Sequence, residues 1–346
     1  MSTAPQQSPL TRGWRSFLGD LSLVMGGVAG LWLLFAGANT ALPYIQPGAE
    51  VVYSAKSQVI RSGSLFRPAA PVKVVIFGNS QVLSGFQPAL FDSLSGGAVS
   101  SYNLGLPDYL LFVANLEHLC KRGERPTHVL MVFPWPDTPE KKFSLLRPGI
   151  DDKRVMDHLF PFRKLLRNLV LFAARASSRG GLTAYYEECR RQTQAMLAQK
   201  GYYFIEAQSH YPGHRLPADF RLQKDDPHRP FLRSASTDAP EFQRITALME
   251  RYGIRLIFVP RYFREGEVAP PEPQSALAAK LAQYPKFSVQ GPDCWLLPNR
   301  YFSDPTHLNE EGAAYYTRRL WTLVGPLLEP QSLAPVEREL GPQVPR

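Results

Sequence analysis

The chain has 346 residues, of which 39 are lysine or arginine and 30 are aspartate or glutamate, so its formal net charge is +9. Hydrophobic residues make up 44% of the chain and charged residues 20%, a composition that excludes intrinsic disorder over most of its length. The three cysteines cannot all pair with one another, and none lies in a Cys-x-x-Cys motif. This pattern argues against a disulfide framework and against a cysteine-based zinc site.

An apolar segment near the N-terminus predicts a membrane anchor. No charged residue occurs between Leu21 and Ala49, a run of 29 residues, and about 20 apolar residues are enough to cross a bilayer as a helix. We expect a leader over residues 1–20 and a transmembrane helix over residues 21–42. Two alternatives are a buried core helix and a signal peptide that is cleaved after Ala36-Gly37-Ala38. Basic residues flank both ends of the run, so charge alone does not orient the helix.

After a linker expected over residues 43–70, short runs of strand character, of which 72–77 is β-branched, alternate with segments of helical character. We expect strands at 72–77, 100–104, 127–133, 254–259 and 286–289, and helices at 87–94, 110–122, 241–252 and 309–323. This alternation predicts an α/β fold built on a doubly wound parallel sheet. The proline-rich tail over residues 331–346 is expected to be disordered.

A long insertion over residues 138–235 separates the third predicted strand from the fourth. Helices are expected within it at 159–176 and 183–199. Residues 139–200 contain 13 lysines and arginines and 6 aspartates and glutamates, so most of the net charge lies in this segment. Such a basic segment favours an anionic polymer or lipid headgroups as a partner, and a solvated helical face is the alternative. Nucleic acid is disfavoured, because we find no recognised binding motif.

The first candidate catalytic residue is Ser80, in the segment Gly78-Asn79-Ser80-Gln81 directly after the first predicted strand. Ligands of open α/β sheets collect at the carboxyl ends of the strands. A serine at this edge presents its hydroxyl there, and the start of the next helix offers N–H groups to an anionic intermediate. The segment is not the Gly-x-Ser-x-Gly elbow, because Val82 replaces the second glycine. A serine that only caps a helix is the alternative.

The second candidate is the segment Asp304-Pro305-Thr306-His307, just before the last predicted helix. An aspartate three residues ahead of a histidine can accept a hydrogen bond from the imidazole and fix its tautomer. The other ring nitrogen is then free to take a proton from a serine. The alternative is that Asp304 or Asn309 caps the helix and that His307 is a surface residue.

Together the two segments resemble the blocks of the SGNH hydrolase superfamily, with a serine after the first strand and Asp-x-x-His before the last helix. The resemblance covers residues 71–330 and implies a flavodoxin-like domain. It extends to Tyr102-Asn103-Leu104-Gly105, so it implies that the N–H groups of Ser80 and Gly105 form an oxyanion hole. The family's third block supplies an asparagine that is missing here, because the third strand leads into Phe133-Pro134-Trp135-Pro136.

With one N-terminal membrane helix, a Gly-x-Ser first block and no third-block asparagine, the chain resembles the SGNH-like proteins of bacterial envelope acylation. These include the alginate O-acetyltransfer proteins and the D-alanyl transfer protein of teichoic acid synthesis. The resemblance implies a single-pass protein of the bacterial inner membrane, with a cytoplasmic leader and a periplasmic domain. It also implies a polysaccharide acyltransferase or esterase that works with a multi-spanning membrane O-acyltransferase.

In the implied mechanism His307, oriented by Asp304, deprotonates Ser80, and no metal or other cofactor is needed. The alternative is a catalytically silent subunit that binds polysaccharide or assembles an exopolysaccharide modification or export complex. Asn79, Arg261 and Tyr262 are candidate substrate-binding residues at the same sheet edge, with purely structural roles as the alternative. His210, His214 and His228 are too irregularly spaced to predict a metal site.

Overall fold

The computed structural model describes residues 9–45, 49–105, 112–132, 165–204, 209–221, 240–266 and 274–328. The chain divides into two compact units. The first contains residues 1–48 and 140–189, and the second contains residues 49–139 and 190–346. The expected disordered tail lies outside the described residues, as do parts of the expected insertion.

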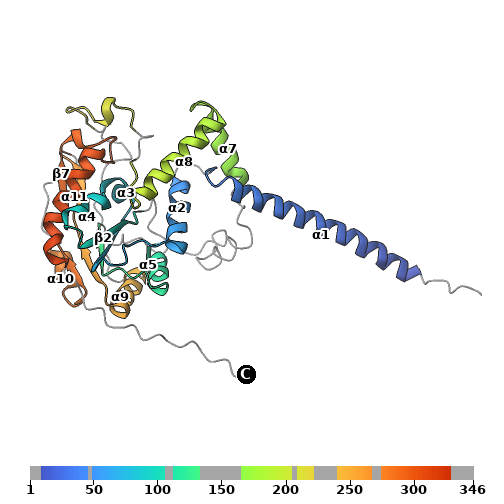
Figure 1. Ribbon diagram of the computed structural model, residues 1–346, viewed down its shortest axis with the longest axis horizontal. Coiled ribbons are helices and arrows are strands. Elements are labelled where there is room, and N and C mark those ends of the chain that lie inside the picture. The colour runs from blue at the N-terminus through green and yellow to red at the C-terminus, as the bar shows by residue number, and fades with distance from the viewer. Residues whose placement is uncertain are drawn as a thin grey trace, which may run out of the picture. The chain divides into compact units, whose positions relative to one another are not determined.

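A parallel sheet of five strands forms the centre of the second unit (Figure 1). The expected strands are all present, and their starts agree with the sequence prediction to within one residue. In spatial order the strands are β2 (Val99–Asn103), β1 (Val72–Phe77), β3 (His128–Met131), β4 (Arg255–Phe258) and β6 (Phe287–Val289). β1 (VKVVIF) is a nearly continuous apolar run, as expected of a buried parallel strand, whereas β2 (VSSYN) is buried although most of its residues are polar.

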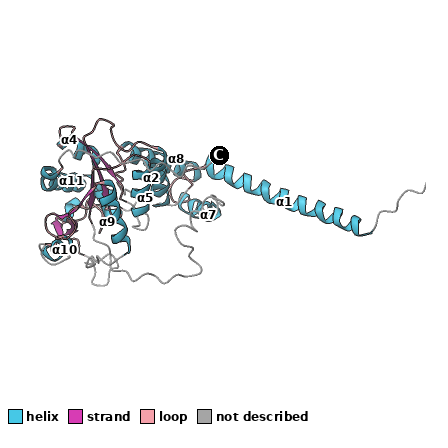
Figure 2. Ribbon diagram, turned by 90° about the horizontal axis from the view of Figure 1, so that it is seen from below, coloured by secondary structure: helices cyan, strands magenta, loops and turns pink. Residues whose placement is uncertain are grey.

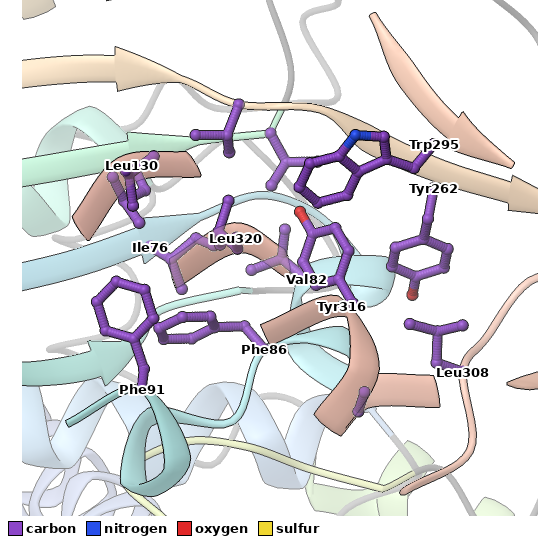
Figure 3. Packing of buried hydrophobic residues seen from close by; sticks show 14 of the residues in the cluster. Ile76, Val82, Phe86, Phe91, Leu130, Tyr262, Trp295, Leu308, Tyr316 and Leu320 are labelled. Atoms are coloured by element: carbon purple, nitrogen blue, oxygen red, sulfur yellow. The ribbon is translucent and has the colours of Figure 1, made fainter. Parts of the chain in front are cut away.

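Helices cover both faces of this sheet, as Figure 2 shows with the strands in magenta. Alternate strand residues point to opposite faces, so Val75 and Phe77 join the cluster that contains α5 and α9. Val74 and Ile76 join the other cluster, on the face of α4 and α11 (Figure 3). The prediction of a doubly wound parallel α/β sheet is confirmed.

The helices of the second unit are α2 (Ala49–Ser62), α3 (Ser80–Gly85), α4 (Pro88–Leu94), α5 (Phe112–Lys121), α9 (Pro240–Tyr252), α10 (Ser275–Leu281) and α11 (Glu310–Val324), with short 3₁₀ helices η3 (Pro212–His214), η4 (Asn299–Tyr301) and η5 (Gly325–Leu327).

A second, two-stranded parallel sheet was not predicted from the sequence. It consists of β5 (Arg261–Arg264) and β7 (Cys294–Leu297). Only Val259 and Pro260 separate β5 from β4, so the chain enters the small sheet directly from the carboxyl end of the large one. This sheet therefore brings its side chains to the edge where the candidate catalytic residues were expected.

The expected linker over residues 43–70 needs correction, because α2 belongs to the folded body. Val52, Lys56 and Ile60 follow one another at intervals of four residues and are all buried. This spacing places them on one face of the helix. Ile60 packs in the same cluster as residues of α5 and α9.

The first unit contains the helices α1 (Pro9–Ala41) and α7 (Leu165–Ala176), together with the first part of α8 (Leu182–Ala198). The segment Phe17–Ala38 of α1 is long and apolar enough to span a membrane, and none of it is buried. Phe172, Ala176, Tyr185 and Cys189 form a small core, against which Tyr44, Ile45 and Tyr186 pack. The two helices expected in the insertion are thus present, and the part of the first before residue 165 lies outside the described residues.

His128 generates a testable prediction about the stability of the sheet. It is buried in β3, and burial together with the nearby Arg255 lowers its pKa from 6.5 to about 4. Between these two values the unfolded chain binds a proton that the folded chain does not, so the free energy of unfolding falls as the pH falls from 6.5 to 4. The loss amounts to about 3 kcal/mol at most.

We expect His128→Gln to remove this contribution to the pH dependence between pH 6.5 and 4, even though the variant is less stable at pH 7. Urea unfolding of both proteins at a series of pH values measures it. An identical pH dependence in the two proteins would contradict the assignment.

Candidate active site

Ser80 is the first residue of α3, immediately after the turn that follows β1. Asn79 is the N-cap of this helix, because its Oδ1 accepts a hydrogen bond from the Gln81 N–H at 3.0 Å. A Cβ on Gly78 would lie 2.3 Å from Cγ2 of Val82, so the turn needs a glycine there. Ser80 is half-buried, and its hydroxyl has no hydrogen-bond partner among the described residues.

Asp304 and His307 form a hydrogen-bonded pair in the loop before α11. Oδ2 of Asp304 lies 2.8 Å from Nδ1 of His307, and Oδ1 accepts from the His307 N–H at 2.8 Å and from the Thr306 N–H at 2.7 Å. Asn309 then caps α11 by accepting from the Gly312 N–H at 2.9 Å. The backbone and the carboxylate together hold the ring in one orientation, as the sequence spacing predicted.

The electrostatics of this pair leave one nitrogen of the histidine available. Burial alone raises the pKa of the Asp304 carboxyl, but hydrogen bonding and attraction to His307 and the two backbone N–H groups outweigh it, so its pKa is lowered. An ionised carboxylate only accepts hydrogen bonds, so Nδ1 carries the proton and Nε2 of the neutral ring is an acceptor. Nε2 is buried and has no partner among the described residues.

Tyr262 of β5 connects the helix that carries Ser80 to the Asp304–His307 loop. Its hydroxyl donates to the carbonyl of Gln81 at 2.8 Å, next to Ser80 in sequence. Its ring packs edge-on against Phe302 with 5.9 Å between centroids, and Leu308 lies in the same buried cluster (Figure 3). The neighbouring Arg264 donates through Nε to the carbonyl of Pro305 at 3.1 Å. The small sheet thus fixes both candidate catalytic segments to one support.

The predicted role of Gly105 in an oxyanion hole is not supported, because its N–H is already engaged. It donates to Oδ1 of Asn103 at 2.8 Å. The Asn103 amide in turn donates to the carbonyls of Val82 and Phe86 at 2.8 and 2.9 Å. A Cβ on Gly105 would lie 2.5 Å from the backbone nitrogen of Leu83, so the glycine is needed for the close approach to α3.

Lys56 is a buried residue beside this site that sequence reasoning missed. Its Nζ donates to the carbonyls of Asn103 and Gly105 at 2.8 and 2.6 Å. Burial lowers the pKa of the lysine well below its usual value. The signal in the sequence was its position on the apolar face of α2, between Val52 and Ile60, where a solvated lysine is not expected.

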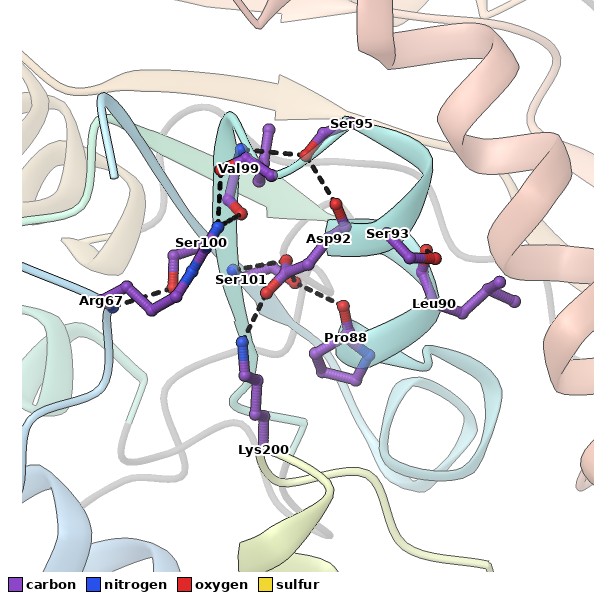
Figure 4. Close-up of polar contacts among 11 residues, drawn as sticks. Arg67, Pro88, Leu90, Asp92, Ser93, Ser95, Val99, Ser100, Ser101 and Lys200 are labelled. Atoms are coloured by element: carbon purple, nitrogen blue, oxygen red, sulfur yellow. Dashed lines mark hydrogen bonds and ion pairs between the residues drawn. The ribbon is translucent and has the colours of Figure 1, made fainter. Parts of the chain in front are cut away.

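The chain that follows α8 also packs against this edge of the sheet. Lys200 forms an ion pair with Asp92, whose Oδ1 accepts from the N–H and the hydroxyl of Ser101 at 2.7 and 2.6 Å (Figure 4). The carbonyl of Lys200 accepts from the Asn103 N–H at 2.9 Å, and Tyr203 N–H donates to the Leu83 carbonyl at 3.1 Å. The part of the predicted insertion directly after α8 therefore supports β2 and α3.

The three residues predicted to bind substrate all have structural roles in the fold, and their contact with substrate stays a prediction. Asn79 caps α3, and the side chains of Arg261 and Tyr262 are buried. His210 is exposed and His214 half-buried, while His228 lies outside the described residues. Residues 133–136, where the family's third block would end, also lie outside them.

No family model matches the chain, and no curated protein or solved structure is found to be similar to it. The function must therefore be argued from the residues themselves.

We predict that Tyr262→Phe slows modification of Ser80 by a serine-reactive fluorophosphonate. Loss of the hydroxyl removes the hydrogen bond to Gln81, and small displacements of a reacting group lower rates by roughly 10- to 100-fold. Tyr316→Phe is the matched control, because this buried hydroxyl also donates to a backbone carbonyl, that of Pro260 at 2.9 Å. Each variant should lose about 1 kcal/mol of stability.

Mass spectrometry of the modified peptide measures the rate at Ser80. Equal rates in the two variants would show that Tyr262 has no role beyond stability.

Proposed function

We propose that the protein is a membrane-anchored acyltransferase or esterase with a Ser80-His307-Asp304 mechanism, acting on a cell-envelope or secreted polysaccharide. The observation that carries the proposal is the buried His307, whose Nδ1 is held by Asp304 while Nε2 has no partner among the described residues. His128 also has a buried Nε2 without a partner among the described residues, so the unpaired nitrogen alone does not mark a base. What sets His307 apart is the ionised carboxylate of Asp304 at its Nδ1, which fixes the tautomer.

In the first half of the reaction, Nε2 of His307 takes the proton of the Ser80 hydroxyl as Oγ attacks the carbonyl carbon of an acyl ester. The resulting tetrahedral oxyanion collapses and expels the donor alcohol, which receives the proton back from His307. The acyl group is then esterified to Ser80. Asp304 stays ionised throughout and stabilises the imidazolium that forms.

In the second half, the hydroxyl of a sugar or a water molecule attacks the acyl-Ser80 ester. His307 accepts the proton of the attacking group and returns it to Oγ as Ser80 leaves. A sugar acceptor makes the reaction a transfer, and water makes it a hydrolysis. The same residues serve both outcomes, so the acceptor decides between them.

The oxyanion needs donors other than the one first expected. Gly105 N–H is bonded to Asn103, which leaves the N–H of Ser80 at the start of α3 as the remaining donor of the predicted pair. Each oxyanion-hole donor contributes roughly 3 to 4 kcal/mol in well-studied enzymes. With the Gly105 N–H engaged, the site lacks the contribution of a second donor.

The five-stranded parallel sheet, with its order β2-β1-β3-β4-β6, supports an SGNH-like domain. The apolar segment Phe17–Ala38 supports a single-pass anchor. We place the domain in the periplasm and the leader in the cytoplasm of a bacterial cell, with a multi-spanning membrane O-acyltransferase as the partner. These last assignments rest on the sequence resemblance alone.

A second candidate function is a catalytically silent subunit that binds polysaccharide or assembles an exopolysaccharide complex. The engaged N–H of Gly105 favours it, because a site without its second oxyanion donor would be weak. The available Nε2 of His307 opposes it.

The test is hydrolysis of a soluble aryl acetate by the detergent-solubilised full chain. Ser80→Ala should lower kcat/KM by a factor on the order of 10³ or more, since loss of a nucleophile removes the covalent pathway. Ser93→Ala is the matched control, because this serine is exposed on α4 and bonds only locally, to the carbonyl of Leu90. Activity that persists in Ser80→Ala would contradict the role of Ser80 as nucleophile, and an unsubstituted chain without activity would favour the silent subunit.

A further inference from the structure

The exposed apolar side chains outside α1 gather mainly in the first unit. Four of the six that the described residues contain belong to it, although this unit is the smaller one. They are Leu42, Val170, Leu171 and Leu182; the other two are Leu94 and Tyr315.

Helix α7 has two different faces, and both are apolar. Leu165, Phe172 and Ala176 are buried on one side. On the opposite side, Val170 is 69% exposed and Leu171 is 40% exposed. A helix that buries one apolar face in its own core and leaves a second one uncovered exposes surface that usually marks an interaction site.

The exposed face of α7 is also basic. Arg167 and Arg175 flank Val170 and Leu171, and both arginines are exposed. No aspartate or glutamate occurs between residues 165 and 186. This combination suits the surface of a bilayer, where acyl chains lie beneath anionic headgroups. The apolar side chains can enter the acyl region while the long arginine stems extend toward the headgroups.

The contacts of this unit hold α7 at the end of the candidate membrane helix. The 22 residues of Phe17–Ala38 span about 33 Å as a helix, close to the roughly 30 Å of hydrocarbon in a bilayer. Tyr44, only six positions after Ala38, packs against Tyr186 with 5.5 Å between ring centroids, and Phe172 of α7 lies in the same cluster. If Ala38 ends the span, Tyr44 and the helices it contacts lie at headgroup level, where tyrosines are enriched.

We infer that α7 docks in the membrane interface itself, with Val170 and Leu171 inserted among the upper acyl chains and Arg167 and Arg175 at anionic phospholipid headgroups. Two helices then hold the protein at the membrane. α1 spans the bilayer, and α7 lies in the interface on the side that carries the residues after α1. This inference needs α1 to span the membrane but is independent of the chemistry at Ser80.

The experiment uses the full chain in phosphatidylcholine–phosphatidylglycerol vesicles, labelled one position at a time with an environment-sensitive fluorophore on cysteine. Leu171→Cys is the test position. Leu94→Cys on α4 is the matched control, since Leu94 is exposed to nearly the same extent, 37%. Leu31→Cys, within the apolar segment, reports whether α1 is in the bilayer. Cys120, Cys189 and Cys294 are buried, and the unsubstituted chain gives their background labelling.

We expect lipids brominated near the headgroup end of the acyl chain to quench the label at position 171, and lipids brominated near the bilayer centre to quench the label at position 31. The label at position 94 should resist both. Quenching at 94 equal to that at 171 would overturn the inference, because exposure alone would then explain it. A blue-shifted but unquenched label at 171 would overturn it in favour of a protein partner, and an unquenched label at 31 would remove its premise.

A separate experiment tests whether the charge of Arg167 contributes to docking. Arg167→Gln should lower the ratio of docked to undocked label by roughly fivefold in anionic vesicles, since each basic residue near such a surface contributes about this factor. The same substitution should change little in pure phosphatidylcholine. Arg318→Gln, an exposed position on α11, is the control. An equal effect of the two substitutions would contradict a role for Arg167 at the headgroups.

Discussion

The carboxylate of Asp304 is the group on which the arrangement of the candidate site depends. Removed from water, it is satisfied by the ring of His307 and by the backbone N–H groups of Thr306 and His307. Charge-assisted hydrogen bonds of this kind are stronger than neutral ones. They keep the carboxyl ionised, fix the imidazole tautomer and leave Nε2 as the acceptor. One buried charge therefore determines both the shape of the loop and the chemistry open to it.

The second requirement is that the loop and the helix carrying Ser80 share a support. The chain passes from β4 into β5 after two residues, and the buried Tyr262 then reaches the carbonyl of Gln81 while its ring packs near Phe302 and Leu308. Burial raises the pKa of Tyr262 well above its usual value, so its hydroxyl stays protonated and remains a donor. The small sheet thus contacts both the loop before α11 and α3, the helix that follows β1.

Much of the fold and part of the candidate site could be predicted from local patterns in the sequence. Short runs of strand character predicted the five strands, and the Asp-x-x-His spacing predicted the hydrogen-bonded pair, because both depend on residues close in sequence. Long-range contacts could not be predicted in this way. The pairing of β5 with β7 joins segments about thirty residues apart, Lys56 bonds to carbonyls beyond residue 100, and the capture of Gly105 N–H depends on the rotamer of Asn103. The expectation of a linker over residues 43–70 was wrong, because the buried face of α2 includes a lysine that interrupts its apolar pattern.

The central claim is that Nε2 of His307 acts as the base for Ser80. The most direct measurement is the rate at which a fluorophosphonate modifies Ser80 as the pH is raised from 5 to 9, in the unsubstituted chain and in His307→Gln. The account predicts that the rate in the unsubstituted chain rises with pH, because Nε2 can accept the Ser80 proton only when it carries none itself. In His307→Gln it predicts a much slower reaction without that rise. Equal rates and equal pH profiles in the two proteins would contradict it.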